Sequence, residues 1–205
     1  MDPIKMAAVL KKKIIFLDLP PETLLNLSEL AAEFGVSRTP VKEALIALYA
    51  EGWVLRHGPH FMVSPLTLER IREITELRVL IEIQANIWAM ERMTPDIWAE
   101  LMEFKKELQH MDEKTEHREL VEMDLRFHRI LYRATRNTNM AEMLERMLNH
   151  YLRFRLSVPR SIERNGFYTK MMEIITAMEL KDHARLREAT YKHISESVNE
   201  IMGLL

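Results

Sequence analysis

The stretch LSELAAEFGVSRTPVKEALIAL, residues 27–48, decides the fold of the first part of the chain. Its first half predicts a short helix, whose start is favoured by the capping-box spacing of Asn26 and Glu29. Gly35 can adopt a left-handed backbone conformation at little steric cost, so it can turn the chain sharply after this helix. Ser37 then caps a second helix, in which apolar residues recur at spacings of three and four. The stretch therefore predicts two helices joined by a tight turn.

The second helix keeps three polar residues, Arg38, Thr39 and Lys42, on its outward side. In a DNA-binding helix-turn-helix, residues at the start of the second helix contact base edges in the major groove. An arginine there can bind O6 and N7 of one guanine, and threonine or lysine can hold a phosphate or a base edge. The alternative is a packing unit whose charges form a solvated face, because helix-turn-helix shapes also occur without DNA.

Two short β-prone runs follow, Trp53–Leu55 and Phe61–Val63, and the sequence HGPH joins them. Their length and spacing predict a β-hairpin of the size of a wing. Arg56, His57 and His60 lie at its tip, where they can contact the DNA backbone or the minor groove.

The two parts of the chain differ in their content of turn-forming residues. Of the 205 residues, 47% are hydrophobic and 29% charged, which suits one large globular domain or two small ones. Glycine and proline concentrate before residue 66, and helical periodicity dominates beyond it. We therefore expect a mainly α fold, with a winged helix-turn-helix and its small β wing in residues 1–66 and an antiparallel bundle of six or seven helices in residues 67–205. The helices expected in the second domain span about residues 67–91, 95–111, 115–135, 138–157, 166–179 and 182–203.

Composition excludes several classes of protein. The formal net charge is −2, and residues 1–64 hold seven basic and seven acidic residues, so overall charge does not argue for a nucleic-acid partner. The chain has no cysteine, which excludes a disulfide framework and cysteine-based zinc sites. No apolar run is long enough to span a membrane, and the start does not have the pattern of a signal peptide. We therefore expect a cytoplasmic protein without a membrane segment.

Asp124 and His128 stand four residues apart in a predicted helix, so their side chains share one face and can point at one ion. By chemistry alone, such a pair is more often a surface pair than a metal site.

Two further pairs of charged residues stand at helical spacings. Arg78 and Glu82 are four residues apart, and an exposed salt bridge between them would contribute only about 0.3–0.5 kcal/mol. Arg153 and Arg155 offer a possible site for an anion. Because they are two residues apart on a helix, we expect at most one of them to point inward.

The segment VSRTPVKEAL, Val36 to Leu45, resembles the VSRTPVREAL pattern of the GntR family of bacterial transcription regulators. The neighbouring SELAAEFG and AEGWV fit the same frame. The resemblance implies a set of DNA-contacting residues: Arg38, Thr39, Lys42, His57 and Gly58. Lys42 replaces the usual arginine, which keeps the charge but loses bidentate geometry. Pro21-Glu22 stands where the family usually has Pro-Gly, a change expected to affect only a turn, and the wing lacks the usual second glycine.

Residues 67–205 resemble the FCD ligand-binding domain of the FadR branch of that family. The matching pieces are TELRVLIE (Thr75–Glu82), MDLRFHRIL (Met123–Leu131) and KDHARLREATYKHI (Lys181–Ile194). The resemblance implies a homodimer that binds a pseudo-palindromic DNA operator, and we expect it to act as a repressor. It also implies that a small-molecule effector, which we expect to be a carboxylate, binds in the helical bundle through Arg78, His128 and His193.

In the metal-binding members of the family, a D-x-x-F-H motif and two later histidines are the ligands. The resemblance therefore implies that Asp124, His128 and His193 hold one divalent ion per subunit, Zn, Ni or Mn. The usual fourth position is Met171, and a thioether is a poor ligand for such ions. Two alternatives stay open: a weakly held ion completed by water or by an effector carboxylate, and direct binding of an anionic effector with no ion.

Three classes of function compete. A DNA-binding regulator explains the exposed Arg38-Thr39 pair and the wing, which a purely structural helical protein would not need. A metal-dependent enzyme built on Asp124, His128 and His193 would need a nucleophile or a general base beside them, and the sequence offers no candidate. The sequence contains neither a P-loop nor a GxGxxG pattern. We therefore expect a transcription regulator and not an enzyme.

Overall fold

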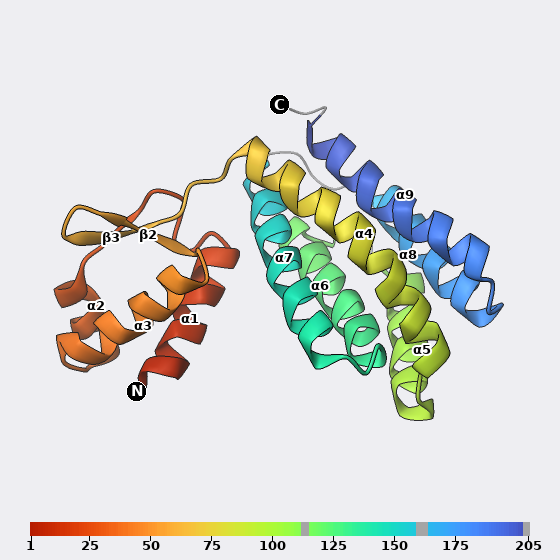
Figure 1. Ribbon diagram of the computed structural model, residues 1–205, viewed down its shortest axis with the longest axis horizontal. Coiled ribbons are helices and arrows are strands. Elements are labelled where there is room, and N and C mark those ends of the chain that lie inside the picture. The colour runs from red at the N-terminus through yellow and green to blue at the C-terminus, as the bar shows by residue number, and fades with distance from the viewer. Residues whose placement is uncertain (112–114, 159–163, 203–205) are drawn as a thin grey trace. The chain divides into compact units, whose positions relative to one another are not determined.

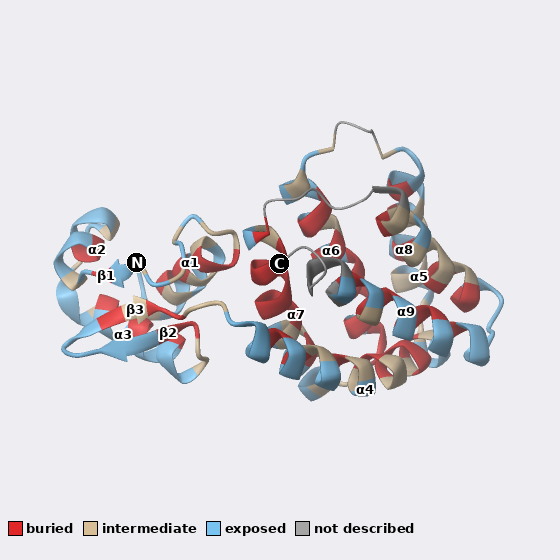
Figure 2. Cartoon of the chain, turned by 90° about the horizontal axis from the view of Figure 1, so that it is seen from above, coloured by how far each residue is buried: buried red, intermediate tan, exposed pale blue. Residues whose placement is uncertain are grey.

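The computed structural model describes residues 1–111, 115–158 and 164–202. The chain divides into two compact units, an N-terminal unit (Met1–Thr67) and a C-terminal unit (Leu68–Leu205). Figure 1 labels their helices and the strands β2 and β3, and Figure 2 labels β1. The N-terminal unit contains α1 (Pro3–Ile15), β1 (Leu24–Leu25), α2 (Leu27–Phe34), α3 (Arg38–Ala50), β2 (Val54–His57) and β3 (His60–Val63). The C-terminal unit contains α4 (Leu68–Arg92), α5 (Pro95–Gln109), α6 (His117–Ala134), α7 (Thr138–Ser157), α8 (Arg164–Glu179) and α9 (His183–Met202).

The predicted helix-turn-helix is confirmed as α2 and α3. The Asn26 side chain accepts hydrogen bonds from the backbone N–H groups of Ser28 and Glu29 and so caps α2. Gly35 ends α2 with φ of 63° and ψ of 38°, the left-handed conformation that the sequence predicted. On α3, the inward-facing residues all lie in the core of the unit: Val41, Ala44, Leu45 and Leu48.

The predicted wing is confirmed, and it belongs to a three-stranded antiparallel sheet with the order β1-β3-β2. His57 on β2 pairs with His60 on β3 at the end of the hairpin. The third strand, β1, was not predicted; its Leu24 pairs with Met62 of β3. A strand of two residues is too short to show alternating hydrophobicity, so the sequence pattern could not reveal it.

Helix α1 was also not predicted, although its signals are present in the sequence. The Asp2 side chain accepts a hydrogen bond from the backbone N–H of Lys5 at 2.9 Å, and a proline follows Asp2 in the first turn. Met6, Leu10 and Ile14 recur every four residues and are fully buried in the core of the unit. The helix thus supplies one wall of the core on which α3 rests.

The C-terminal unit is a bundle of six helices in the described part of the chain, as predicted, so the mainly α fold class is confirmed. The buried side of each helix faces its neighbours in the bundle, as Figure 2 shows. The predicted bounds agree with the observed ones to within about two residues, except that position 203 lies outside the described residues. Asp182 caps α9, because its side chain accepts from the backbone N–H of Arg185 at 3.0 Å. None of the helices in the described ranges combines the length and the apolar character needed to cross a bilayer.

Candidate DNA-binding surface and buried metal site

Three of the predicted DNA-contacting residues, Arg38, Thr39 and Lys42, are exposed on the first turns of α3. They line a concavity of about 330 Å³ together with Arg56 and Pro59 of the hairpin. We call this surface the wing concavity; its remaining lining residues are Leu27 and Phe61. The guanidinium of Arg56 lies 4.1 Å above the centre of the Phe61 ring, which holds the arginine against the sheet. The concavity is therefore cationic, with charges supplied by both the helix and the wing.

The start of α3 is open to an acceptor from outside. Ser37 occupies the N-cap position, but its side chain makes no capping hydrogen bond in the described structure, and the first turn carries no acidic residue. The first N–H groups of a helix have no partner within the helix, and the helix dipole favours an anion there. The arrangement suits a DNA phosphate next to the wing concavity.

His57 and Gly58, the other two predicted DNA contacts, lie at the exposed tip of the hairpin and do not line the wing concavity. Gly58 has φ of 58°, a left-handed conformation that the tight turn requires and that glycine tolerates best. The sequence predicts only that Arg56 lies near the tip of the hairpin. Its place beside Arg38 and Lys42 depends on how the hairpin folds back along α3, which no local pattern reveals.

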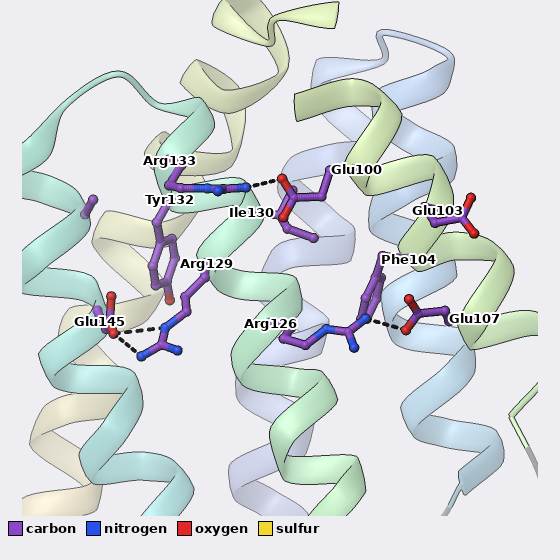
Figure 3. Close-up of a pocket in the computed structure, with 11 residues that line it drawn as sticks. Glu100, Glu103, Phe104, Glu107, Arg126, Arg129, Ile130, Tyr132, Arg133 and Glu145 are labelled. Atoms are coloured by element: carbon purple, nitrogen blue, oxygen red, sulfur yellow. Dashed lines mark hydrogen bonds and ion pairs between the residues drawn. The ribbon is translucent and has the colours of Figure 1, made fainter. Parts of the chain in front are cut away.

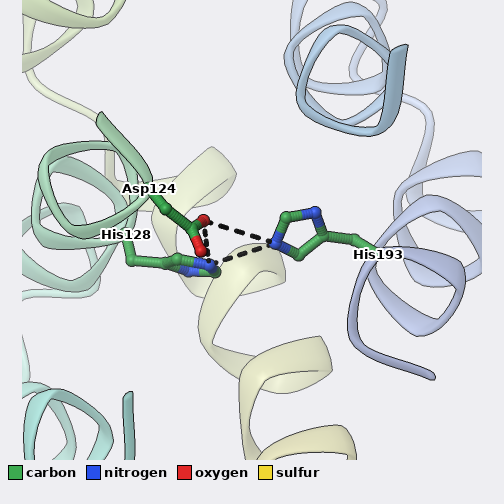
Figure 4. A group of neighbouring side chains, drawn as sticks. All are labelled: Asp124, His128 and His193. Carbon is green, nitrogen blue, oxygen red and sulfur yellow. Dashed lines mark hydrogen bonds and ion pairs between the residues drawn. The ribbon is translucent and has the colours of Figure 1, made fainter. Parts of the chain in front are cut away.

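In the C-terminal unit, Asp124 and His128 of α6 meet His193 of α9, as Figure 4 shows. The two Nε2 atoms are 3.1 Å apart. The Asp124 Oδ1 lies 3.4 Å from the Nε2 of His128 and 3.9 Å from that of His193. All three side chains are buried. We call this group the ion cluster.

The protonation states of the ion cluster suit a cation. Burial lowers the pKa of the His193 imidazole to about 3, so this side chain is neutral at pH 7. Burial alone would raise the pKa of the Asp124 carboxyl, but the close polar contact with the His128 side chain beside it holds that pKa below its usual range. Divalent ions bind neutral imidazole and ionised carboxylate, and two of these three groups are already in that state.

The ion cluster also passes a geometric test. Two nitrogens bound to one ion at about 2.0–2.1 Å lie roughly 3 Å apart when the angle at the ion is near 90–110°, which matches the observed separation of 3.1 Å. The Asp124 Oδ1 is buried and has no hydrogen-bond partner among the described residues. A cation would satisfy it. Met171, which stands at the usual fourth position of the metal-binding members, is fully buried in α8, and its thioether would be a poor ligand for such an ion.

Arg78 and Glu82 form the predicted pair, but it is buried and not exposed. Arg78 donates to Glu82 through Nε at 2.6 Å and through Nη2 at 3.2 Å, and the Tyr132 hydroxyl donates to Glu82 at 2.7 Å. Burial alone would raise the pKa of the Glu82 carboxyl, but Arg78 beside it holds that pKa below its usual range. Arg78 therefore reaches the ion cluster through Glu82, whose Oε2 lies 3.7 Å from the Nδ1 of His128.

The expectation that at most one of Arg153 and Arg155 points inward is wrong, because both are buried, with 0% and 7% of their surface exposed. Helix α7 packs against both α4 and α6, and all of residues 148–155 are buried, so the helix has no exposed side along this stretch. Arg155 donates to the Tyr151 hydroxyl at 2.7 Å, and Arg78 lies over the face of the same ring.

A second concavity, of about 420 Å³, lies between α5, α6 and α7 on the C-terminal unit. Figure 3 shows that arginines of α6 are paired with glutamates of the two neighbouring helices around it. The pairs are Arg126 with Glu107, Arg129 with Glu145, and Arg133 with Glu100. The fourth acidic residue of the lining, Glu103, pairs with Lys106 beside the concavity. The concavity therefore carries charges of both signs, in contrast to the wing concavity.

Two family models match the chain. The model of the FCD domain matches residues 73–196, and the model of bacterial regulatory proteins of the gntR family matches residues 5–59.

Known proteins resemble the chain at moderate identity. The HTH-type transcriptional regulator McbR of Escherichia coli K12 is 29% identical over 139 residues, which cover 67% of this chain and 63% of McbR, so the match spans less than two thirds of that relative. The gluconate operon transcriptional repressor of Bacillus subtilis is 25% identical over 216 residues, which cover 98% of this chain and 85% of the repressor. A solved structure of E. coli McbR/YncC aligns with a TM-score of 0.84 at 22% sequence identity, over 98% of this chain and 97% of that chain. At this identity, the similarity shows only that the two chains share a fold.

The FCD match covers more than half of the chain, and the gntR match covers the helices and most of the hairpin that carry the wing concavity. The chain therefore belongs to the GntR family of bacterial transcriptional regulators, and its C-terminal unit contains an FCD domain.

Proposed function

We propose that the protein is a homodimeric transcription repressor in the cytoplasm. Residues 1–66 bind a pseudo-palindromic operator, and residues 67–205 bind a carboxylate effector and form the dimer. The observation that carries the proposal is the convergence of Arg38, Lys42 and Arg56 on the wing concavity. The gluconate operon relative is named as a repressor, which supports the sign of the regulation.

On DNA, each α3 enters a major groove, and the two half-sites lie about 34–36 Å apart. Arg38 reads a guanine through O6 and N7, and Thr39 contacts a base edge or a phosphate. Lys42 and Arg56 hold the backbone on the two sides of the wing concavity, and His57 and Gly58 follow the groove at the tip of the hairpin.

The homodimer is supported by an uncovered apolar stripe on α4. Leu77 and Leu80 expose 50% and 72% of their surfaces, and they lie three residues apart on one side of the helix. A second copy of the chain would cover this stripe. Two recognition helices are also what a pseudo-palindromic operator needs.

In the bundle, Asp124, His128 and His193 would hold one divalent ion, Zn, Ni or Mn. When bound, the ion supplies positive charge that attracts the carboxylate of an effector. His128 and His193 would hold the ion as neutral imidazoles. Arg78 would support this site indirectly, because it pairs with Glu82, which lies beside His128. An effector releases the operator only if its affinities for the DNA-bound and the free arrangement of the dimer differ.

Catalysis is not part of the proposal. Glu82 lies 3.7 Å from His128, but Arg78 and Tyr132 already donate to it, so it is poorly placed to act as a general base. The Ser197 hydroxyl donates to the backbone carbonyl of His193, so it is engaged there and not with the three side-chain donors of the cluster. The cluster therefore suits ligand binding.

The experiment begins with DNA selected from a random pool by the wild-type protein. Replacing Arg38 with alanine should weaken binding to the selected operator by about 1–3 kcal/mol and relax the preference at one base pair. Competition binding by fluorescence anisotropy with base-substituted operators measures both effects. Arg72→Ala, which removes an exposed arginine from α4, is the control and should leave binding unchanged. If the wild-type protein enriches no sequence, the proposed function is wrong.

Arg56→Ala tests the backbone contact separately. Because a phosphate contact carries no sequence information, operator and unrelated DNA should lose affinity by the same factor. The slope of log affinity against log salt concentration should fall by about 0.9 for the one lost contact. A changed base preference with an unchanged slope would instead place Arg56 on a base edge.

A further inference from the structure

Glu82 lies on the far side of His128 from the other two residues of the ion cluster. The Nε2 of His128 faces Asp124 and His193, whereas its Nδ1 faces the Glu82 Oε2 at 3.7 Å. Glu82 comes from α4, so it approaches His128 from a different helix than either of the other two residues. Both nitrogens of the ring are therefore directed at charged or polar groups.

Binding an ion would fix the proton on the ring of His128. A neutral imidazole carries one proton, and the nitrogen that binds an ion must be the bare one. With Nε2 on the ion, the proton resides on Nδ1 and needs an acceptor. The structure leaves this buried Nδ1 without a hydrogen-bond partner among the described residues. Glu82 provides the carboxylate oxygen next to it.

Glu82 is itself held in place from two sides. Its Oε1 accepts from the Arg78 Nε at 2.6 Å and from the Tyr132 hydroxyl at 2.7 Å. Its Oε2 accepts one longer hydrogen bond, from the Arg78 Nη2 at 3.2 Å. The less engaged oxygen is the one that faces His128, and a carboxylate oxygen can accept a second hydrogen bond. The gap of 3.7 Å is about 0.8 Å longer than a hydrogen bond of ordinary length.

We infer that Glu82 is a positioning residue for the divalent ion: it accepts the Nδ1 proton of His128 and thereby aims Nε2 at the ion. Arg78 and Tyr132 hold the carboxylate in place for this role. The inference rests on the ion site of the proposed function and adds to it a residue that touches no ion. The inference also assigns a role to Arg78. Its direct contact is with Glu82, which it holds in place, and not with the ion or the effector.

The experiment titrates the metal-free, full-length protein with Co²⁺, whose visible absorption reports the ligand field. Wild type should bind one Co²⁺ per subunit, and Glu82→Gln should bind it about 10–100-fold more weakly, the range found when such supporting partners of a ligand are removed. The visible spectrum of the bound Co²⁺ should also change, because the ring of His128 loses its fixed orientation. Chelator competition gives the dissociation constants, and circular dichroism establishes that each variant is folded.

Thr135→Val is the matched control. Thr135 is a fully buried polar residue two turns further along the chain from His128, and its hydroxyl bonds only backbone groups near the end of α6. This variant should be less stable to heat but should bind Co²⁺ within twofold of wild type. If Glu82→Gln does not fold, the double variant Arg78→Met with Glu82→Gln removes both buried charges and should show the same loss of Co²⁺ affinity.

Two results would overturn the inference alone: a folded Glu82→Gln that binds Co²⁺ as tightly as wild type, or an equal loss of affinity in Thr135→Val. A wild-type protein that binds no Co²⁺ at all would overturn the ion site of the proposed function, and the inference with it. DNA binding would be untouched by that result, so the failures are distinguishable.

Discussion

At the scale of single residues, Glu22 holds a backbone conformation that its side chain disfavours. Its φ is 64°, in the left-handed region, and its side chain is exposed. Its backbone N–H donates to the carbonyl of Val63 at 3.0 Å, so the sheet fixes this conformation. Glycine is the usual residue here in the family that the sequence resembles, and a non-glycine residue pays about 1–2 kcal/mol in this region.

Replacing Glu22 with glycine should therefore stabilise the N-terminal unit by about 0.5–1 kcal/mol, after subtraction of the entropy that glycine loses on folding. Urea unfolding followed by circular dichroism measures the change. Glu43→Gly makes the same chemical substitution at an exposed position inside α3 and should destabilise by about 1 kcal/mol. Equal effects of the two substitutions would show that backbone strain at Glu22 is unimportant.

At the scale of elements, the turn between α2 and α3 sets the direction of the recognition helix. Gly35 alone carries the left-handed conformation there, and a Cβ added to it would meet no atom within 4 Å. The cost of a side chain is therefore backbone strain and not a clash.

Gly35→Ala should destabilise the N-terminal unit by about 1 kcal/mol, and Gly35→Asn should cost less, because asparagine tolerates the left-handed region better. Thermal unfolding ranks the three proteins. If alanine and asparagine cost the same, the left-handed backbone is not the source of the effect.

The same scale shows where sequence patterns succeed and fail. Long helices with caps, such as the one that begins after Asp182, were located closely because caps and periodicity are local signals. Strand β1 was missed because two residues show no period, and its pairing partner lies far along the chain. Helix α1 was missed although the capping residue Asp2 and the spacing of its buried residues both indicate a helix. The signals for α1 are therefore local and present in the sequence, unlike those for β1.

At the scale of the whole molecule, the apolar stripe on α4 predicts how two copies associate. Leu80→Glu should leave the fold of one chain intact, because 72% of the Leu80 surface is exposed. Burying two carboxylates in the interface should convert the dimer to a monomer. The affinity for an operator with two half-sites should then fall at least tenfold, since two linked contacts bind more tightly than one.

Sedimentation equilibrium and operator titration check this prediction. Leu180→Glu is the control, because Leu180 is similarly exposed at 62% but lies in the turn after α8. It should remain dimeric. If Leu80→Glu also remains dimeric, the stripe on α4 is not the interface.

The sequence by itself determined the helix-turn-helix, the hairpin and the common helix face of Asp124 and His128, because each depends on residues within a few positions of one another. It also determined that Arg78 and Glu82 would pair. Only the tertiary structure decided that this pair is buried, that Arg153 and Arg155 are both covered, and that His193 comes within 3.1 Å of a residue 65 positions before it. The physical reason is that local backbone geometry follows from near neighbours, whereas the approach of two helices depends on how every side chain in the bundle packs.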